Sequence, residues 1–374
     1  VIANIQLTGN YPHAVGVYSD LNRVYVANTG GPKISVVDTD LLREITTIPA
    51  CSSPVAICVN PSTGLVYVAC DVDNCVQVID ASSNTSVDTI TVGALPYAIC
   101  VNPVTNRIYT ANLSESTVSV IDGHTNQVIA TIAVGAYPRG ICVDPLRNLI
   151  YVAERDDNSV SVIDGSTNAV IATIPVGAAP HNICVDSVRN MIYVVCAGNR
   201  LVYVIDGSSD VPIDSLAVGR DPVGGIAIDV GSNEIYVTNY GSNDISVVDG
   251  ATISVGATIR LAFYAREVAV DQTGRRWYVT NSLGNNVRCY EPATSTLVWD
   301  QTVGYSPGEI RVCNAIAGVT VDRLYVTLPD TNSLVVLDLA TGTPLDTLTV
   351  GSSPRGVTVN EPVSYTHLTL PTKA

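Results

Sequence analysis

The feature that most constrains this chain is an internal repeat with a period of about 42 residues. A tyrosine closes the same short apolar run in every copy. The first five of these tyrosines are equally spaced along the chain, and the last interval is the longest. They are Tyr25, Tyr67, Tyr109, Tyr151, Tyr193, Tyr236, Tyr278 and Tyr325. Such a period indicates an array of supersecondary units, none of which can bury its apolar faces alone.

Each copy contains four segments typical of β-strands. In the second copy they are residues 54–60, 64–70, 75–80 and 86–92. These runs are rich in Val, Ile, Thr and Tyr and are too short for helices, and turn-forming residues separate them. Each copy is therefore predicted to be a four-stranded antiparallel meander, and meanders at this spacing are typical of β-propeller blades. We expect an all-β, eight-bladed propeller, with a seven-bladed ring and a spare unit as the alternative.

Several recurring motifs give the copies a family resemblance. Residues 24–28 read VYVAN, and residues 235–239 and 277–281 read IYVTN and WYVTN. Residues 118–122 and 160–164 read VSVID, and residues 138–144 read PRGICVD. Over residues 1 to about 360 the chain resembles the YVTN-type repeat β-propellers. It departs from the pattern at Ala265, which replaces Pro, and where the motif's Asn is replaced by Cys70, Glu154, Cys196 and Leu328.

The repeat predicts one propeller domain over residues 1–362. Residues 1–7 match the fourth strand of a copy and residues 354–359 match the first, so a single strand overhangs at each end. These overhangs suggest that the chain is a fragment of a longer protein. Residues 363–374 depart from the pattern entirely, resemble a non-native tail, and are excluded from functional reasoning.

Charge and hydropathy limit the classes of partner that this chain can bind. The net charge is −15, so polyanions such as nucleic acid should be repelled, and no nucleic-acid partner is expected. No apolar stretch is long enough to span a bilayer, and no transmembrane segment is predicted. The resemblance to YVTN-type proteins implies an extracytoplasmic or cell-surface location.

Six of the ten cysteines fall into two groups. Four recur once per copy in the first strand, which favours a packing role for Cys58, Cys100, Cys142 and Cys184. Cys70 and Cys75 flank a hairpin, where a disulfide between them is a hypothesis that depends on an oxidising compartment. The chain has no Cys-x2-Cys spacing and no clustered Cys/His spacing, so no metal site is predicted.

The candidate site lies where the repeat stops being uniform. The first strand of a blade runs along the central channel, so the residue after the repeated proline should line the channel mouth. This slot holds Val55, Val223 and Gly308 in some copies, and elsewhere the predicted ligand-binding residues His13, Tyr97, Arg139, His181, Arg266 and Arg355. A cationic mouth in an acidic protein suits a polar or anionic ligand. Ordinary solvated side chains at strand starts are the alternative.

The loops between the second and third strands lie on the same face, which we call the top face. Their oxygen-bearing side chains could hold Ca²⁺ or a sugar, although hairpin turns require the same residue types. No cofactor is predicted beyond this possible divalent cation. The residues are Asn28, Asn112, Glu154, Asp156, Asp157, Asn239, Asn281 and Asn285.

Three functions are compatible with these patterns. The first is a non-catalytic scaffold that holds a protein, a glycan or a small polar or anionic ligand on its top face, and the lack of catalytic motifs favours it. The second is an enzyme, because similar propellers include lactonases and streptogramin-type lyases; His13, His181 and Glu267 would then be catalytic. The third is a surface-layer or filament element joined through its overhanging strands.

Overall fold

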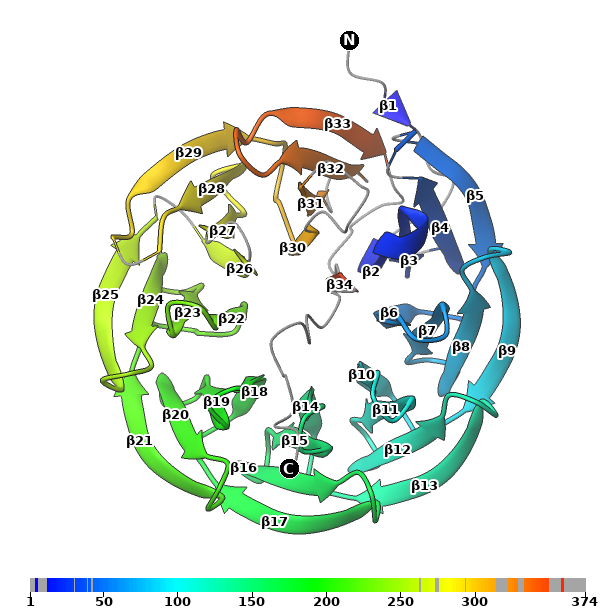
Figure 1. The fold of residues 1–374 in the computed structure, drawn as a ribbon, viewed down its shortest axis with the longest axis horizontal. Helices are drawn as coiled ribbons and strands as arrows, with labels where there is room; N and C mark the ends of the chain where they lie inside the picture. Colours follow the sequence, from blue (N-terminus) through cyan, green and yellow to red (C-terminus); the bar gives the residue numbers. More distant parts are fainter. Residues whose placement is uncertain are drawn as a thin grey trace, which may run out of the picture.

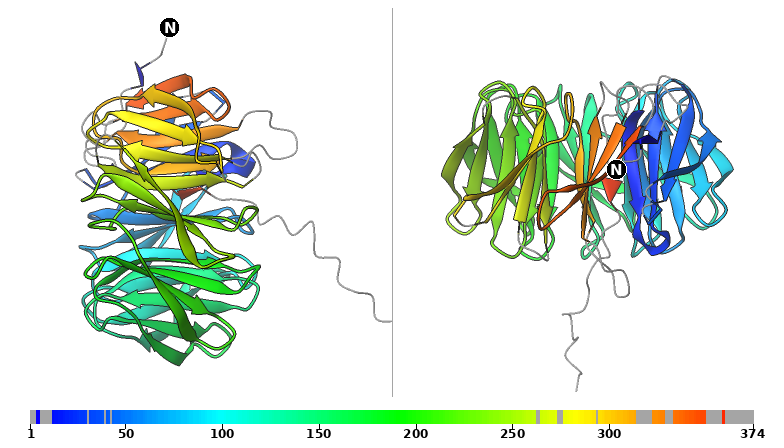
Figure 2. Two further views of the ribbon diagram at one scale, coloured as in Figure 1. Left: turned by 90° about the vertical axis from the view of Figure 1, so that its left-hand side faces the viewer. Right: turned by 90° about the horizontal axis from the view of Figure 1, so that it is seen from above.

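Eight four-stranded antiparallel blades surround a central channel (Figure 1). The computed structural model describes residues 4–5, 12–29, 31–38, 40–41, 43–261, 264–272, 276–292, 294–313, 322–328, 333–349 and 358–359. Seen from the side, the ring is a short cylinder with loops on both faces (Figure 2). The prediction of eight blades is confirmed, and the seven-bladed alternative is wrong.

Within each blade, strands a, b, c and d follow one another in chain order from the channel outward. Blades 1 to 4 consist of β2 (Pro12–Tyr18), β3 (Arg23–Asn28), β4 (Lys33–Asp38), β5 (Arg43–Pro49), β6 (Pro54–Asn60), β7 (Leu65–Cys70), β8 (Cys75–Asp80), β9 (Thr85–Thr91), β10 (Pro96–Asn102), β11 (Arg107–Asn112), β12 (Thr117–Asp122), β13 (Gln127–Ala133), β14 (Pro138–Asp144), β15 (Leu149–Glu154), β16 (Ser159–Asp164) and β17 (Ala169–Pro175). A short 3₁₀ turn, η1 (Ser19–Leu21), links β2 to β3.

Blades 5 to 8 repeat this order. They consist of β18 (Pro180–Asp186), β19 (Met191–Cys196), β20 (Leu201–Asp206), β21 (Val211–Ala217), β22 (Ile226–Asp229), β23 (Glu234–Asn239), β24 (Asp244–Asp249), β25 (Ser254–Arg260), β26 (Ala265–Asp271), β27 (Arg276–Asn281), β28 (Asn286–Tyr290), β29 (Leu297–Thr302), β30 (Ile310–Cys313), β31 (Arg323–Leu328), β32 (Ser333–Asp338) and β33 (Pro344–Thr349).

The hydrophobic core lies between neighbouring blades. Strands b and c are buried on both sides, which explains their nearly continuous apolar sequences, whereas strand d alternates between exposed and covered residues on the rim. At the interface between blades 1 and 2, Ile34 and Val36 pack in one cluster with Val66 and Val68. Burial at these interfaces holds the ring together.

The repeated tyrosines occupy these interfaces. All eight side chains are buried, with at most 2% of their surface exposed. The Tyr25 hydroxyl reaches the c–d turn of blade 2, where it donates to Asn84 Oδ1 at 2.9 Å. Tyr67 donates in the same way to Asn126 Oδ1 of blade 3 at 3.2 Å. In these two copies the hydroxyl of the repeated tyrosine therefore joins one blade to the next.

Both overhanging segments contain a short strand in the described residues. β1 (Asn4–Ile5) runs parallel to β33, and β34 (Thr358–Val359) runs parallel to β2, so blades 8 and 1 have five strands each. The four antiparallel strands of every blade come from one continuous stretch of chain. The predicted tail, residues 363–374, lies outside the described residues. Among the described residues, no helix has the length and apolar character that crossing a membrane requires.

The cysteines follow the predictions in part. Cys58, Cys100, Cys142 and Cys184 pack in or against the interface cores, which confirms their packing role. Burial raises the pKa of all four thiols above the ordinary range. Cys70 and Cys75 lie opposite each other on β7 and β8, but the bridge joins Cys70 to Cys51, and their Cα atoms are 6.1 Å apart. The hypothesis of a Cys70–Cys75 bridge is therefore wrong, because the linker before β6 brings Cys51 to the end of β7.

Candidate functional site

The slot after the repeated proline is a β-bulge. In blades 3, 4 and 5 the proline and the second residue after it pair with consecutive residues of strand b, so the residue between them has no partner. The unpaired residues are Tyr97, Arg139 and His181. A bulge redirects one side chain without disturbing the rest of the ladder. This explains how one position can vary inside a uniform repeat.

The bulge residues and one loop residue form a cationic arc at the channel mouth. The Arg139 guanidinium lies 5.2 Å from the centre of the Tyr97 ring and donates to its hydroxyl at 3.3 Å. Arg155, in the b–c loop of blade 4, lies 4.9 Å from the centre of the Tyr137 ring. Stacking on an aromatic face stabilises a guanidinium and leaves N–H groups for another acceptor.

The pKa of His181 is lowered by burial and by the positive charges of this arc. Burial, followed by the charges of Arg139 and Arg155, lowers its pKa from 6.5 to about 4, although a contact with the Asn182 side chain acts in the opposite direction. The two side chains meet at 3.3 Å, from His181 Nδ1 to Asn182 Oδ1. His181 is therefore a neutral imidazole at pH 7, with two guanidinium groups nearby.

The depressed pKa of His181 makes stability depend on pH. The unfolded chain binds the proton more tightly than the folded chain, so folding loses stability as the pH falls from about 6.5 to about 4. We expect His181→Gln to reduce this loss by about 1–3 kcal/mol, with solvent in the channel screening the full effect. Urea denaturation at several pH values measures it. His124→Gln, in the exposed c–d turn of blade 3, is the matched control and should leave the loss unchanged.

Blade 7 contributes a wider bulge on another side of the mouth. Arg266 and Glu267 together oppose Thr280 alone, because Ala265 pairs with Asn281 and Val268 with Val279. Burial raises the pKa of the Glu267 carboxyl, although the charges of Arg311 and Arg266 oppose this effect. The site therefore also contains a carboxyl group that burial biases toward its protonated form.

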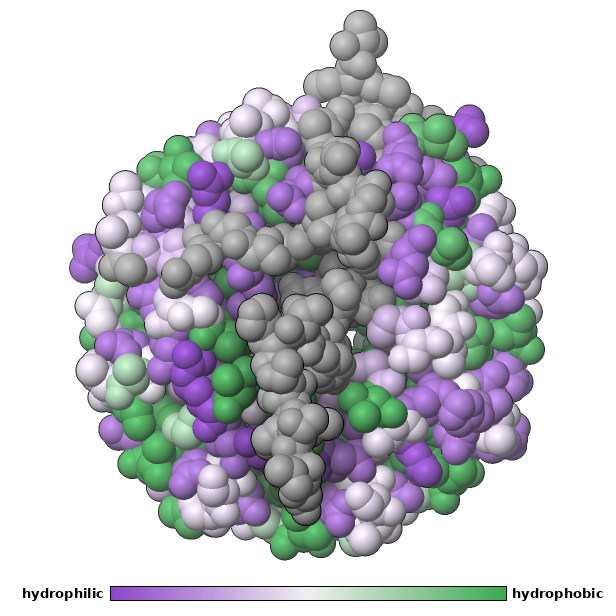
Figure 3. Space-filling model, viewed as in Figure 1, coloured by the Kyte–Doolittle hydropathy of each residue, from purple (hydrophilic) through white to green (hydrophobic). Residues whose placement is uncertain are grey.

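These residues line one large cavity, the central channel, with a volume of about 1650 Å³. Its walls are the apolar residues of the inner strands, such as Ile57, Ile99 and Val101. Its ionisable lining includes Arg139, Arg155, His181, Arg266, Glu267, Glu309 and Arg311. Polar groups that converge on a cavity with apolar walls are typical of a small-molecule site, and this channel is larger than such sites usually are. On one face of the ring, the described residues show polar and apolar side chains interspersed over the blades (Figure 3).

The structure brings together only part of the predicted site. Tyr97, Arg139 and His181 share one arc, and Arg266 lies across blade 6 from them. The electrostatic neighbours of His181 are Arg139 and Arg155, whereas those of Glu267 are Arg311 and Arg266. His181 and Glu267, two of the conditional catalytic candidates, therefore have different charged neighbours.

The side chains of two of the six predicted ligand-binding residues lie outside the described part of the chain. His13 lies on β2, across the channel from β18, but its side chain is outside the described part of the chain (Figure 1). Arg355 also lies outside the described residues. Arg155 was missed by sequence reasoning, because it occupies a loop position that the proline slot does not mark.

The oxygen-bearing residues of the b–c loops are used inside the blades. Asn28, Asn112, Glu154 and Asn239 are fully buried, and the three asparagines donate to side chains on strand c. Others cap the linkers between blades: Asp157 accepts from the Ala136 amide at 2.7 Å, and Asn285 accepts from the Ser306 amide at 3.1 Å. These contacts support the turn interpretation over a Ca²⁺ or sugar site.

An eight-bladed ring around a central channel defines this chain as a β-propeller. A family model described as YNCE-like beta-propeller matches residues 101–273. The match supports a β-propeller family, and the YVTN-type assignment stays a prediction. No curated protein matches the sequence.

Two solved structures have a similar fold. One is dihydro-heme d1 dehydrogenase NirN in complex with DHE, with a TM-score of 0.75 and 16% identity, covering 94% of this chain and 78% of that chain. The other is hydrazine synthase from Kuenenia stuttgartiensis, with a TM-score of 0.61 and 17% identity, covering 78% of this chain and 98% of that chain. At these identities the likeness shows the fold alone.

Proposed function

We propose that this propeller is a binding protein that holds a small anionic ligand at the mouth of its channel. One observation carries the proposal. Among the described residues, no carboxylate forms an ion pair with Arg139 or Arg266, although the chain has 34 acidic residues and a net charge of −15. Several other arginines form ion pairs, as Arg147 does with Asp144 at 2.8 Å and as Arg311 of the channel lining does with Glu309 at 3.4 Å.

The chemistry of the mouth favours carboxylate or phosphate groups. Guanidinium groups bind planar oxyanions through two parallel N–H donors. Tyr97 adds an aromatic face and a hydroxyl beside Arg139. The Nε atom of Arg139 is buried and has no hydrogen-bond acceptor among the described residues. A bound anion would also raise the pKa of His181, because it would offset the two positive charges that now lower it.

The test is a thermal-shift and calorimetry panel of di- and tricarboxylates, sugar phosphates and uronic acids, with neutral sugars for comparison. We expect an anion to bind and the Arg139→Gln variant to weaken it about 10- to 100-fold, because a charged hydrogen bond is worth about 1.5–3 kcal/mol. Affinity should also fall as the salt concentration rises.

Arg107→Gln is the matched control, because it removes the same charge at the start of β11, on the opposite face of the ring. It should leave binding unchanged. If Arg139→Gln and Arg266→Gln bind every anion as well as the parent, or if neutral sugars bind equally well, the mouth is not an anion site. The search for a ligand would then turn to protein and glycan partners.

A second candidate function is an enzyme acting in the same channel. The observation that favours it is the Glu267 carboxyl group. Burial raises its pKa against the opposing charges of two arginines, and a general acid requires a raised pKa. Turnover of lactone substrates that disappears in Glu267→Gln, with the fold intact, would support this function. Turnover that survives the substitution would remove Glu267 from the mechanism.

The surface-layer alternative stays a prediction. The two described overhanging strands pair with this chain's own last and first blades. They therefore give the alternative no additional support.

A further inference from the structure

Blade 2 has a cysteine at three positions where blade 3 has none. Cys51 lies in the linker before β6, Cys70 ends β7, and Cys75 begins β8. One repeat later along the chain, the same positions hold Gly93, Asn112 and Thr117.

These three positions converge in the ring. In blade 3, a Cβ atom added to Gly93 would lie 2.6 Å from Asn112 Nδ2. Asn112 Nδ2 itself donates to Thr117 Oγ1 at 3.0 Å and to Ser119 Oγ at 2.9 Å. Blade 3 thus fills this pocket with hydrogen-bonding groups, whereas blade 2 fills it with sulfur.

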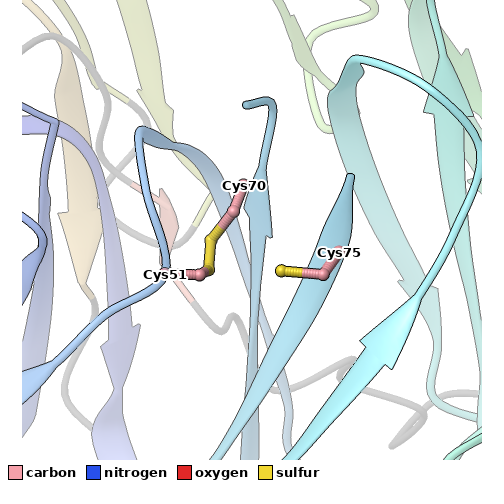
Figure 4. A group of neighbouring side chains, drawn as sticks. All are labelled: Cys51, Cys70 and Cys75. Atoms are coloured by element: carbon pink, nitrogen blue, oxygen red, sulfur yellow. A yellow bond between two sulfur atoms is a disulfide. The ribbon is translucent and has the colours of Figure 1, made fainter. Parts of the chain in front are cut away.

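The three sulfur atoms of blade 2 lie within 4.8 Å of one another. Figure 4 shows the bridge between Cys51 and Cys70, with the Cys75 sulfur pointing toward it. Cys70 and Cys75 are buried, and Cys51 is partly exposed. The cluster is therefore open to solvent from the side of Cys51.

We propose that reduction of the Cys51–Cys70 bridge converts this cluster into a three-thiolate site for a thiophilic metal ion of the Zn²⁺ class. Tetrahedral coordination at a Zn–S distance of about 2.3 Å requires sulfur atoms about 3.8 Å apart, which lies inside the observed limit. Thiolate ligands select such soft or borderline ions over Ca²⁺ and Mg²⁺.

Gln77 provides an oxygen beside the Cys51 sulfur. Its Oε1 atom lies 3.9 Å from Cys51 Sγ. Its Nε2 atom is held by the Pro49 carbonyl at 2.8 Å and by Ser86 Oγ at 2.9 Å, which fixes the direction of the amide. The carboxamide oxygen is the fourth ligand in this arrangement.

The disulfide must be reduced before the site can bind a metal ion. A dithiol reductant supplies two electrons and two protons, the S–S bond breaks, and the dithiol becomes a cyclic disulfide. Metal binding then displaces the three thiol protons. In the oxidised chain only one of the three sulfurs carries a proton, and the site is closed.

The test is a titration of the full chain with Cd²⁺, which gives an ultraviolet thiolate-to-metal absorption band, followed by displacement with Zn²⁺. The reduced protein should bind one ion in the cluster, and the oxidised protein should show no such band. Cys51→Ser should remove the band; because Cys51 is partly exposed, this variant should fold normally by circular dichroism.

Cys196→Ser is the matched control. Cys196 ends strand b of blade 5 as Cys70 does in blade 2, but Gly177 and Leu201 occupy the two companion positions. This variant should keep the band. A reduced parent protein that gives no band would overturn the proposal. So would a folded Cys51→Ser protein that keeps the parent's band, because the ion would then be bound by other thiols.

Discussion

Glu154→Ala is expected to lower the free energy of unfolding by about 3–5 kcal/mol, because it removes the centre of a buried polar network. The Glu154 side chain is fully buried at the end of β15. Its carboxylate accepts from the Gly135 amide at 2.7 Å, from Ser159 Oγ at 2.5 Å, and from Ser161 Oγ. Alanine would leave these donors buried without a partner. Urea denaturation followed by circular dichroism measures the loss.

Glu154→Asn is the control for this prediction. Asparagine occupies the same position in blades 1, 3, 6 and 7. In blades 1, 3 and 6 its amide donates to the serine that corresponds to Ser161, as Asn112 does to Ser119 at 2.9 Å. The freed Ser161 hydroxyl can then accept from Gly135, as Ser119 accepts from the Gly93 amide at 3.3 Å. Asparagine should therefore cost much less than alanine. Equal losses in the two variants would show that the shape of glutamate matters and its hydrogen bonds do not.

Gly224→Ala is expected to destabilise the ring by about 3 kcal/mol or more, through overpacking of a backbone contact. A Cβ atom at Gly224 would lie 1.9 Å from the Arg266 carbonyl oxygen and 2.2 Å from Thr238 Oγ1. That carbonyl also accepts from the Gly225 amide at 3.0 Å, so the methyl group would push blades 6 and 7 apart. The substitution should also weaken the binding of an anion at the mouth, because it displaces Arg266.

Gly256→Ala provides the comparison. Gly256 lies on the outer strand β25, where the nearest atom to an added Cβ is the Val247 carbonyl oxygen at 3.9 Å. Alanine restricts the unfolded chain without a clash, so stability should stay the same or rise by up to about 1 kcal/mol. If the Gly224→Ala and Gly256→Ala proteins have the same free energy of unfolding, blades 6 and 7 can move apart at little cost, which would contradict the prediction.

Most of the fold could be predicted from the sequence, because each blade is encoded locally. Four apolar runs and their turns recur at a fixed distance, and a tyrosine such as Tyr67 marks the same buried position each time. The channel mouth could be predicted in outline as well. The slot after the proline varied against a uniform background, and Tyr97, Arg139 and His181 all line the cavity.

The remaining features depend on contacts between repeats or on backbone detail. The partner of Cys70 is Cys51, 19 residues earlier and in a linker, and only the assembled ring brings the two together. Arg155 lies in a hairpin loop whose sequence resembles an ordinary turn. The bulges left no separate signal, because they lie at the start of the first strand, before its apolar run begins.

One further consequence follows from building each blade from a single uninterrupted stretch of chain. Eight such blades each turn the chain by about 45° around the axis, and a ring that lost one repeat would need about 51° from each of the rest. The interior of every blade would stay as it is, while the opening would narrow and lose one of its lining side chains. Duplication or deletion of a whole repeat would therefore change the width of the channel more than any point substitution would.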